Sequence, residues 1–171
     1  MKNKSNIVMI GMPGAGKSTV GVVLAKTMGM DFVDVDLVIC RRHGGNLQDI
    51  VNRFSHEDFL RIEGEAALSL KSENSVIATG GSMVYSEDAM RYLKEIGTVV
   101  YIRAGLRDLE KRITNLKTRG IAFNPGETLA DLYNARIPLY EKWADITVDT
   151  SAGDRIEDMA FKIKSELDKD E

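Results

Sequence analysis

Five short hydrophobic runs, rich in β-branched residues, are spread along the chain. Within each run the hydrophobic residues are continuous and do not alternate with polar ones. Continuous runs are typical of strands that are buried on both faces of a parallel sheet. We therefore predict strands at Ile7–Ile10, Val33–Val35, Val76–Thr79, Thr98–Ile102 and, as a shorter element, Ile146–Val148.

Between the predicted strands, hydrophobic residues recur at helical spacing, most clearly at 106–116 and 156–167. Ser55 and Asp58 resemble a capping box at the start of a further helix. Strands that alternate with helices indicate an α/β, doubly wound fold with one parallel sheet. We expect a single domain over residues 1–171.

The hydrophobic pattern is interrupted after the first strand by GMPGAGKS, residues 11–18. This stretch matches G-x-x-x-x-G-K-[ST] and lies between a predicted strand and a helical run at 19–28. Glycines let backbone N–H groups converge on an anion, and the helix N-terminus adds partial positive charge. The motif predicts a P-loop for the phosphates of ATP, formed by Gly11, Gly14, Ala15, Gly16, Lys17, Ser18 and Thr19.

Two carboxylates, Asp34 and Asp36, close the second predicted strand. The carboxyl ends of parallel strands face the ligand crevice, and alternate residues of an extended chain point to one side. We expect one carboxylate to hold Mg²⁺ through water and the other to orient, and deprotonate, a substrate hydroxyl. The alternative for Asp36 is an N-cap of the next helix.

Further binding residues follow the third strand and lie near the C-terminus. Gly80 and Gly81 permit close approach of the backbone to a ligand, or else form a simple turn. Arg136 precedes Pro138 by two residues, and a proline bends or ends a helix, which would aim the arginine into a crevice. A guanidinium suits a bidentate grip on a substrate carboxylate.

The segment 118–128 holds two glycines, a proline and an asparagine between two helical patterns, and we expect a mobile lid there. Arg112 and Arg119 lie near its start. Phosphoryl transfer needs cations that neutralise moving charge, although an exposed arginine is often merely solvated.

The composition of the chain indicates which partners and which cellular compartment to expect. A net charge of −3 argues against non-specific nucleic-acid binding. The only cysteine, Cys40, fits a reducing compartment, and no hydrophobic stretch approaches the roughly 20 residues of a membrane span. We expect a cytoplasmic protein with a small-molecule substrate and no nucleic-acid or membrane partner, and a monomer rather than an oligomer.

Taken together, the motifs resemble the shikimate kinase family over nearly the whole chain. The resemblance is carried by IGMPGAGKSTVG, FVDVD, ATGG, GTVVYI and RIPLYEKWADITVDT, in that order. It implies a P-loop kinase fold with a five-stranded parallel sheet, helices on its faces and a lid at about 112–127. It also implies transfer of the γ-phosphoryl group of ATP to a hydroxyl of a small carboxylate metabolite, by family default shikimate.

The resemblance also implies roles for individual residues. Lys17 and Ser18 would bind phosphate and Mg²⁺, Asp34 would hold the magnesium shell, and Arg112 would lie by the adenine. On the acceptor side, Asp36 would bind the substrate hydroxyl together with Gly80 and Gly81, Arg119 would be the lid arginine, and Arg136 would grip the carboxylate.

Three departures from the family pattern fall on the acceptor side. In the family pattern an arginine lies three residues before the glutamate that corresponds to Glu63, and here that position is Leu60. The neighbouring Arg61 is rotated from it by about 100° on a helix. The usual third glycine is Ser82, and the usual Arg-Pro-Leu-Leu of the lid is replaced at 119–122 by Arg-Gly-Ile-Ala. These changes are similar to those in shikimate-kinase-like homoserine kinases and in the kinase-like domain of threonine-synthase-like proteins.

Several functions therefore remain open. Homoserine carries an ammonium beside its carboxylate and would tolerate the loss of one cation, so it rivals shikimate; another hydroxy acid is also possible. A nucleotide-binding module without kinase activity would keep the P-loop and lose the acceptor site, against which Asp36, Arg119 and Arg136 argue. A nucleoside monophosphate kinase would need a more basic segment at 44–64.

Overall fold

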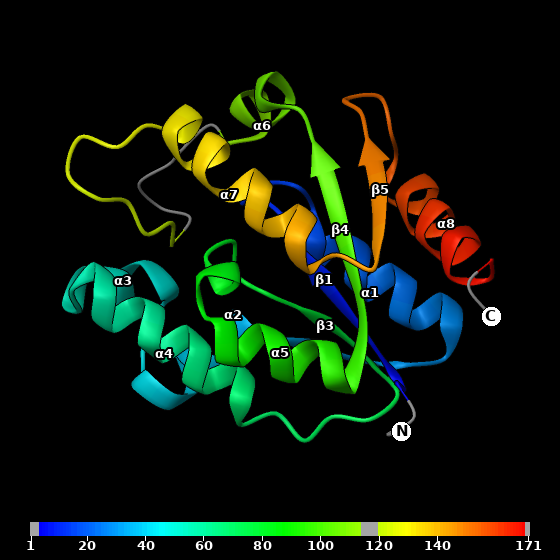
Figure 1. Cartoon of the computed structure of the whole chain (residues 1–171), viewed down its shortest axis with the longest axis horizontal. Coiled ribbons are helices and arrows are strands. Elements are labelled where there is room, and N and C mark those ends of the chain that lie inside the picture. The colour runs from blue at the N-terminus through cyan, green and yellow to red at the C-terminus, as the bar shows by residue number, and fades with distance from the viewer. Residues whose placement is uncertain (1–3, 114–119, 170–171) are drawn as a thin grey trace.

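The computed structural model describes residues 4–113 and 120–169. Five parallel strands form one sheet in the order β2-β3-β1-β4-β5 (Figure 1). The strands are β1 Asn6–Ile10, β2 Asp31–Asp34, β3 Ser75–Ala78, β4 Gly97–Ala104 and β5 Ile146–Thr150. All five predicted strands are confirmed, with their ends shifted by a few residues.

The middle of the sheet explains why the hydrophobic runs are continuous. β1 lies between β3 and β4, where Ile7 pairs with Val76 on one side and with Thr98 on the other. Every residue of β1 and β3 is buried. Such strands need hydrophobic side chains on both faces, because helices cover both sides of the sheet.

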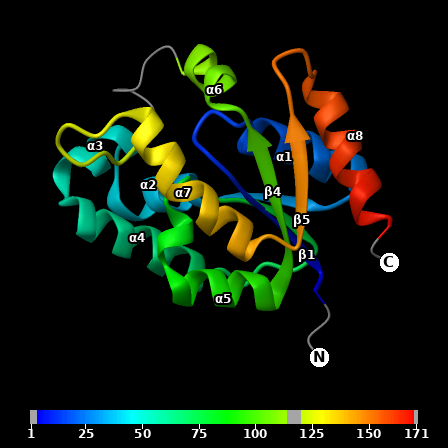
Figure 2. The same ribbon diagram turned by 45° about the horizontal axis from the view of Figure 1, so that its top comes forward.

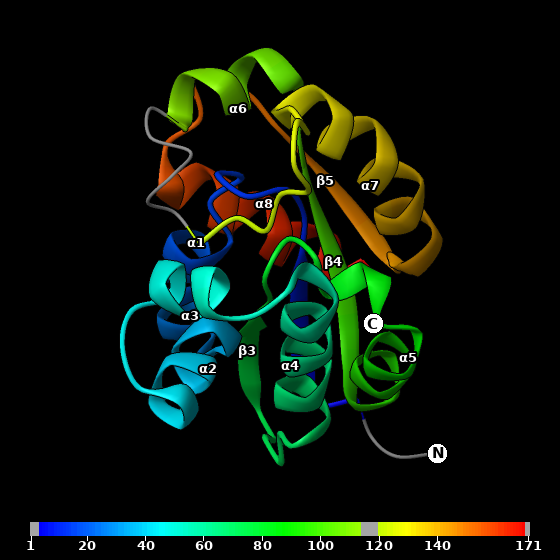
Figure 3. The same cartoon turned by 90° about the vertical axis from the view of Figure 1, so that its left-hand side faces the viewer.

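Helices cover the sheet in two layers (Figures 1 and 3). α1 and α8 pack together on one face, and α5 and α7 contact β4 on the other. The helical elements are α1 Lys17–Met28, α2 Val35–His43, α3 Leu47–Arg53, α4 His56–Leu68, the 3₁₀ helix η1 Met83–Tyr85, α5 Glu87–Ile96, α6 Leu106–Arg112, α7 Leu129–Trp143 and α8 Ile156–Leu167. The predicted α/β fold is confirmed.

The chain between β2 and β3 forms a group of three helices, α2, α3 and α4, that pack on one another. The hydroxyl of Ser55 accepts a hydrogen bond from the backbone N–H of Asp58 and so caps α4. The segment 120–128 leads into α7 and passes next to α3 (Figures 1 and 2). This group of helices and this segment together border the site described below.

α6 ends at Arg112 with Ile113 as its C-cap, so the helical pattern predicted over 106–116 is found as far as Arg112; its last residues, 114–116, lie outside the described residues. α7 continues through Pro138, so this proline does not end the helix. Part of the predicted lid, 114–119, lies outside the described residues. Over 4–113 and 120–169, no helix is both long and hydrophobic enough to cross a membrane.

Candidate active site

A cavity of about 580 Å³ lies where β1, β2 and β3 end at their carboxyl edge. Most of the predicted site residues line it, namely Gly14, Gly16, Lys17, Ser18, Thr19, Asp36, Gly80, Gly81, Arg112 and Arg136. Gly11, Ala15 and Asp34 are not part of the lining, and Arg119 lies outside the described residues. The structure therefore brings the two predicted groups of residues, for phosphate and for acceptor, into one cavity.

The P-loop connects β1 to α1 and is shaped to hold an anion. Gly16 is the N-cap of α1 with φ 98°, and no side chain caps the helix there. The first backbone N–H groups of a helix need partners, and without a capping side chain a phosphate oxygen can supply them. The loop geometry fits the triphosphate that the motif predicts.

Lys17 is buried, and its Nζ donates hydrogen bonds to the carbonyl oxygens of Gly11 and Met12 at 2.7 and 2.8 Å. Burial lowers the pKa of the Lys17 ammonium to about 8, while the nearby carboxylate of Asp36 opposes that shift. Among the described residues no carboxylate forms an ion pair with Lys17; a buried cation in this situation is costly, and a bound phosphate would offset that cost.

Asp34 is the N-cap of α2, and its Oδ1 accepts the backbone N–H of Asp36 at 2.9 Å. Its Oδ2 accepts the hydroxyl of Ser18 at 2.8 Å. The prediction that Asp34 and Asp36 alternate along one strand is wrong, because β2 ends at Asp34 and Asp36 belongs to the first turn of α2. The hydroxyl and carboxylate oxygens of Ser18 and Asp34 are ligands that Mg²⁺ prefers.

Asp36 faces the cavity from the first turn of α2. Burial raises the pKa of its carboxyl to about 6; the nearby Asp34 carboxylate adds to the shift and Lys17 opposes it. A carboxylate whose pKa lies closer to neutrality is a better proton acceptor at physiological pH. Asp36 is thus suited to orient and deprotonate a hydroxyl.

Gly80 and Gly81 follow β3 and let other groups approach the backbone closely. A Cβ added at Gly80 would lie 2.3 Å from Oε1 of Glu63, and one at Gly81 would lie 2.9 Å from Nη1 of Arg136. At Gly81 the nearest atom would be Cδ of Pro13, at 2.7 Å, so at this position the P-loop itself leaves little room for a larger residue. Gly81 also lies in a turn, in which the backbone N–H of Met83 donates to the carbonyl oxygen of Gly80 at 3.2 Å, so the simple-turn alternative stays open.

Arg136 projects from α7 and is 1% exposed. Within the described part of the chain, its Nε and Nη2 have no hydrogen-bond partner. A buried guanidinium with unpaired N–H groups is expensive unless a ligand satisfies it. The arginine lines the same cavity as Asp36 and Lys17, and a substrate carboxylate would supply the missing acceptors.

A model of the shikimate kinase family matches residues 13–168. The chain belongs to the shikimate kinase family. It is 38% identical to a shikimate kinase of Thermodesulfovibrio yellowstonii, with 96% of this chain and 95% of that protein covered. It is also 36% identical to human threonine synthase-like 1, over 92% of this chain and 22% of that protein.

Among solved structures, a shikimate kinase from Acinetobacter baumannii in complex with shikimate is 31% identical, with a TM-score of 0.89 and 99% of this chain and 96% of that chain covered. The predicted family and fold are therefore confirmed. Membership of the shikimate kinase family makes this protein a phosphotransferase that acts on an alcohol group, as the motifs predicted.

The structure shows where the departures from the shikimate kinase pattern lie. Leu60 is half-buried on α4 and is absent from the described lining of the cavity. Arg61 points to solvent, where it pairs with Asp58 and Glu65 on its own helix. Neither residue supplies a second cation to the acceptor side, so the prediction that Arg61 cannot substitute is confirmed.

Glu63 also lines the cavity, a position that the sequence pattern did not predict. Its carboxylate is buried and accepts a short hydrogen bond from the hydroxyl of Ser82, which replaces the third glycine. Burial raises the pKa of Glu63 to about 7, against the effect of this hydrogen bond. A glutamate within the buried stripe of a helix was a signal that could have found it.

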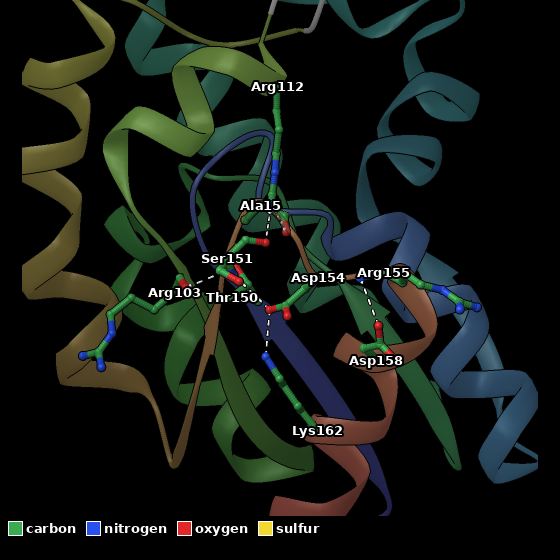
Figure 4. A network of polar contacts seen from close by, with 9 residues as sticks. All are labelled: Ala15, Arg103, Arg112, Thr150, Ser151, Asp154, Arg155, Asp158 and Lys162. Atoms are coloured by element: carbon green, nitrogen blue, oxygen red, sulfur yellow. Dashed lines mark hydrogen bonds and ion pairs between the residues drawn. The ribbon is translucent and has the colours of Figure 1, made fainter.

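Arg112 lies between the P-loop and the connection from β5 to α8 (Figure 4). Its Nη1 is 3.5 Å from the carbonyl oxygens of Gly14 and Ala15, and its Nη2 donates to the carbonyl of Ser151 at 3.2 Å. Asp154 in turn accepts the backbone N–H of Ser151 at 2.9 Å. Arg112 therefore braces one edge of the P-loop and remains a candidate neighbour of the adenine.

Proposed function

We propose that this protein is an ATP-dependent shikimate kinase, which transfers the γ-phosphoryl group of ATP to a hydroxyl of shikimate and forms shikimate 3-phosphate. The observation that carries the proposal is the buried, partly unpaired Arg136 in the same cavity as the P-loop and Asp36. The family of the chain, and the shikimate complex of its relative from Acinetobacter baumannii, support the same acceptor.

The nucleotide and its magnesium ion fit the residues that are present. The N-terminus of α1 and Lys17 would hold the outer phosphates, and Ser18 with Asp34 would hold Mg²⁺, the latter through water. When bound, Mg²⁺ neutralises charge on the phosphate oxygens. Arg112 would lie beside the base, and Arg119 stays a predicted lid cation.

The reaction that we propose is a direct in-line transfer. A hydroxyl oxygen of the acceptor bonds to the γ-phosphorus while the bond from that phosphorus to the β–γ bridging oxygen breaks, and ADP leaves. Asp36 orients the hydroxyl and takes its proton, and Lys17 stabilises the charge that develops on the phosphates. Arg136 fixes the carboxylate, which holds the hydroxyl in line.

Homoserine is the second candidate acceptor, and the acceptor side carries a specific observation in its favour. Leu60 supplies no cation, so among the described cavity residues outside the P-loop and α6 the carboxylate would rely on Arg136, while the buried carboxylate of Glu63 lies in the same cavity. An amino acid presents both a carboxylate and an ammonium, and so matches such a pair of charges. The similarity to threonine synthase-like 1 is consistent with this acceptor.

The decisive experiment compares shikimate and L-homoserine side by side in an assay of ADP release with Mg-ATP. We expect the higher kcat/KM with shikimate, and loss of turnover in a Lys17→Ala variant but not in Lys26→Ala, which alters an exposed lysine of the same helix. A higher kcat/KM with homoserine would identify homoserine, and not shikimate, as the acceptor. Tight ATP binding without turnover of either compound would indicate a nucleotide-binding module.

We also propose that the active form is a monomer. A single chain already brings the P-loop, Asp36 and Arg136 into one cavity, so these groups need no second copy to come together. Light scattering coupled to size-exclusion chromatography, with activity assayed across the peak, measures this directly. Activity confined to a larger species would contradict it.

A further inference from the structure

Residues 120–122 form a wall between two cavities. Ile121 and Ala122 line the active-site cavity and also a second, mainly hydrophobic cavity of about 670 Å³. Phe54, Phe59 and Phe123 contribute to the far side of this wall. Both wall residues are buried, so the position of this short segment sets part of the shape of the active site.

A side chain of α3 holds the wall by a hydrogen bond. The backbone N–H of Gly120 donates to Oε1 of Gln48 at 2.9 Å. Nε2 of Gln48 donates to Oδ1 of Asn52 at 3.0 Å, one turn further along α3. Because the amide nitrogen is engaged by Asn52, the oxygen of Gln48 faces Gly120 and serves as its acceptor.

The backbone of Gly120 is also fitted to α3 by shape. Its φ is +65°, and a Cβ added there would lie 2.5 Å from Cδ2 of Leu47. A residue other than glycine would therefore meet both backbone strain and a steric clash. The sequence places a glycine where the shikimate kinase pattern has proline, and a proline would lack the N–H that Gln48 binds.

We propose that Gln48 is a positioning residue for phosphoryl transfer: through Gly120 it holds the wall at 120–122 against the active-site cavity. α3 belongs to the helices next to Asp36, so this bond fixes the wall relative to the acceptor side. A wall held in place keeps water from the γ-phosphoryl group, since an open site lets water compete with the acceptor. The inference rests on the proposed kinase function of the cavity.

The test compares the wild type with Gln48→Ala, Gln48→Met and Gln48→Glu. Met keeps the length of the side chain without an acceptor oxygen, whereas Glu keeps an acceptor. For Ala and Met we expect kcat to fall about 3- to 10-fold, as for one lost hydrogen bond, with the KM for ATP unchanged. In the same two variants, ATP hydrolysis without acceptor should rise relative to transfer. Gln48→Glu should keep the wild-type kcat and the wild-type ratio of ATP hydrolysis to transfer.

Hydrogen exchange of the Gly120 amide gives a second measurement that does not depend on the acceptor. Exchange should be about 3- to 10-fold faster in Gln48→Ala and Gln48→Met and unchanged in Gln48→Glu. Wild-type exchange and kinetics in the Ala and Met variants would overturn the proposal, as would equal losses in all three variants. If the wild type transfers phosphate to no acceptor, the proposed function fails, while exchange and acceptor-free hydrolysis still judge the role of Gln48.

Discussion

The phosphate half of the cavity is lined from one continuous stretch between the end of β1 and the start of α1, residues 13–19, whereas the acceptor half is assembled from distant elements. Asp36 comes from α2, Glu63 from α4, Gly81 from the turn after β3 and Arg136 from α7. The first half offers mainly backbone N–H groups and one lysine, whereas the second offers charged side chains. Substitutions can therefore change the acceptor while phosphoryl transfer is kept.

The largest effect is expected where the two halves meet, at Asp36. Asp36→Asn removes the proton acceptor while keeping the size of the side chain, so kcat should fall about 10²- to 10⁴-fold. The KM for ATP should change less than about 3-fold, since the phosphate half is intact. Steady-state kinetics with Asp31→Asn, an exposed aspartate of β2, provide the matched control. A near-normal kcat would remove Asp36 from the chemistry.

Arg136 tests whether the acceptor half acts independently of the nucleotide. Arg136→Leu should raise the KM for the acceptor about 10- to 150-fold, because a charge-assisted contact is worth about 1.5–3 kcal/mol. The KM for ATP should remain as in the wild type. Arg61→Leu is the control, since Arg61 is 59% exposed and its surface ion pairs contribute little. An equally large rise in the KM for the acceptor in Arg61→Leu would show that Arg136 is not the sole arginine that binds the acceptor.

The pH dependence of kcat/KM should differ between the two halves, with a loss at low pH for the acceptor and at high pH for ATP. Asp36 with a pKa of about 6 must be ionised to accept a proton, so kcat/KM for the acceptor should fall below pH 6, about 10-fold per unit. Lys17 with a pKa of about 8 must stay charged, so kcat/KM for ATP should fall above pH 8. Glu63→Gln should leave the acid limb in place; its disappearance would assign that limb to Glu63, whose pKa is about 7.

The same contrast explains what could be predicted from the sequence. The P-loop and the five strands depend on local patterns, and the structure places them where these patterns indicated. The predicted placement of Asp34 and Asp36 on one strand was wrong. Asp34 is both the last residue of β2 and the N-cap of α2, so Asp36 already belongs to the helix. Glu63 was overlooked as a cavity residue, and the contact between Gln48 and Gly120 was not predicted, since both depend on tertiary packing between segments far apart in the chain.

Tyr140 belongs to neither half alone, and its removal should have the smallest effect. Its hydroxyl donates to the carbonyl of Gly81 at 2.6 Å and lies 3.8 Å from the sulfur of Met12, next to the P-loop. Tyr140→Phe keeps the ring stacked on Tyr101, with centroids 5.1 Å apart, and removes only the hydroxyl. The free energy of unfolding should therefore decrease by about 0.5–1.5 kcal/mol, the usual worth of one hydrogen bond.

The kinetic consequence of Tyr140→Phe depends on whether the hydroxyl of Tyr140 is held more strongly by Gly81 or by Met12. A sulfur atom is a weak acceptor, so the bond to Gly81 dominates, and Gly81 lies against Arg136. The KM for the acceptor should rise about 2- to 5-fold, within the range of one lost hydrogen bond, while the KM for ATP stays constant. Tyr133→Phe, on the same helix and half-buried, is the control. A larger change in the KM for ATP than in the KM for the acceptor would mean that Tyr140 supports the P-loop through Met12. The two halves of the cavity would then depend on the same packing contact.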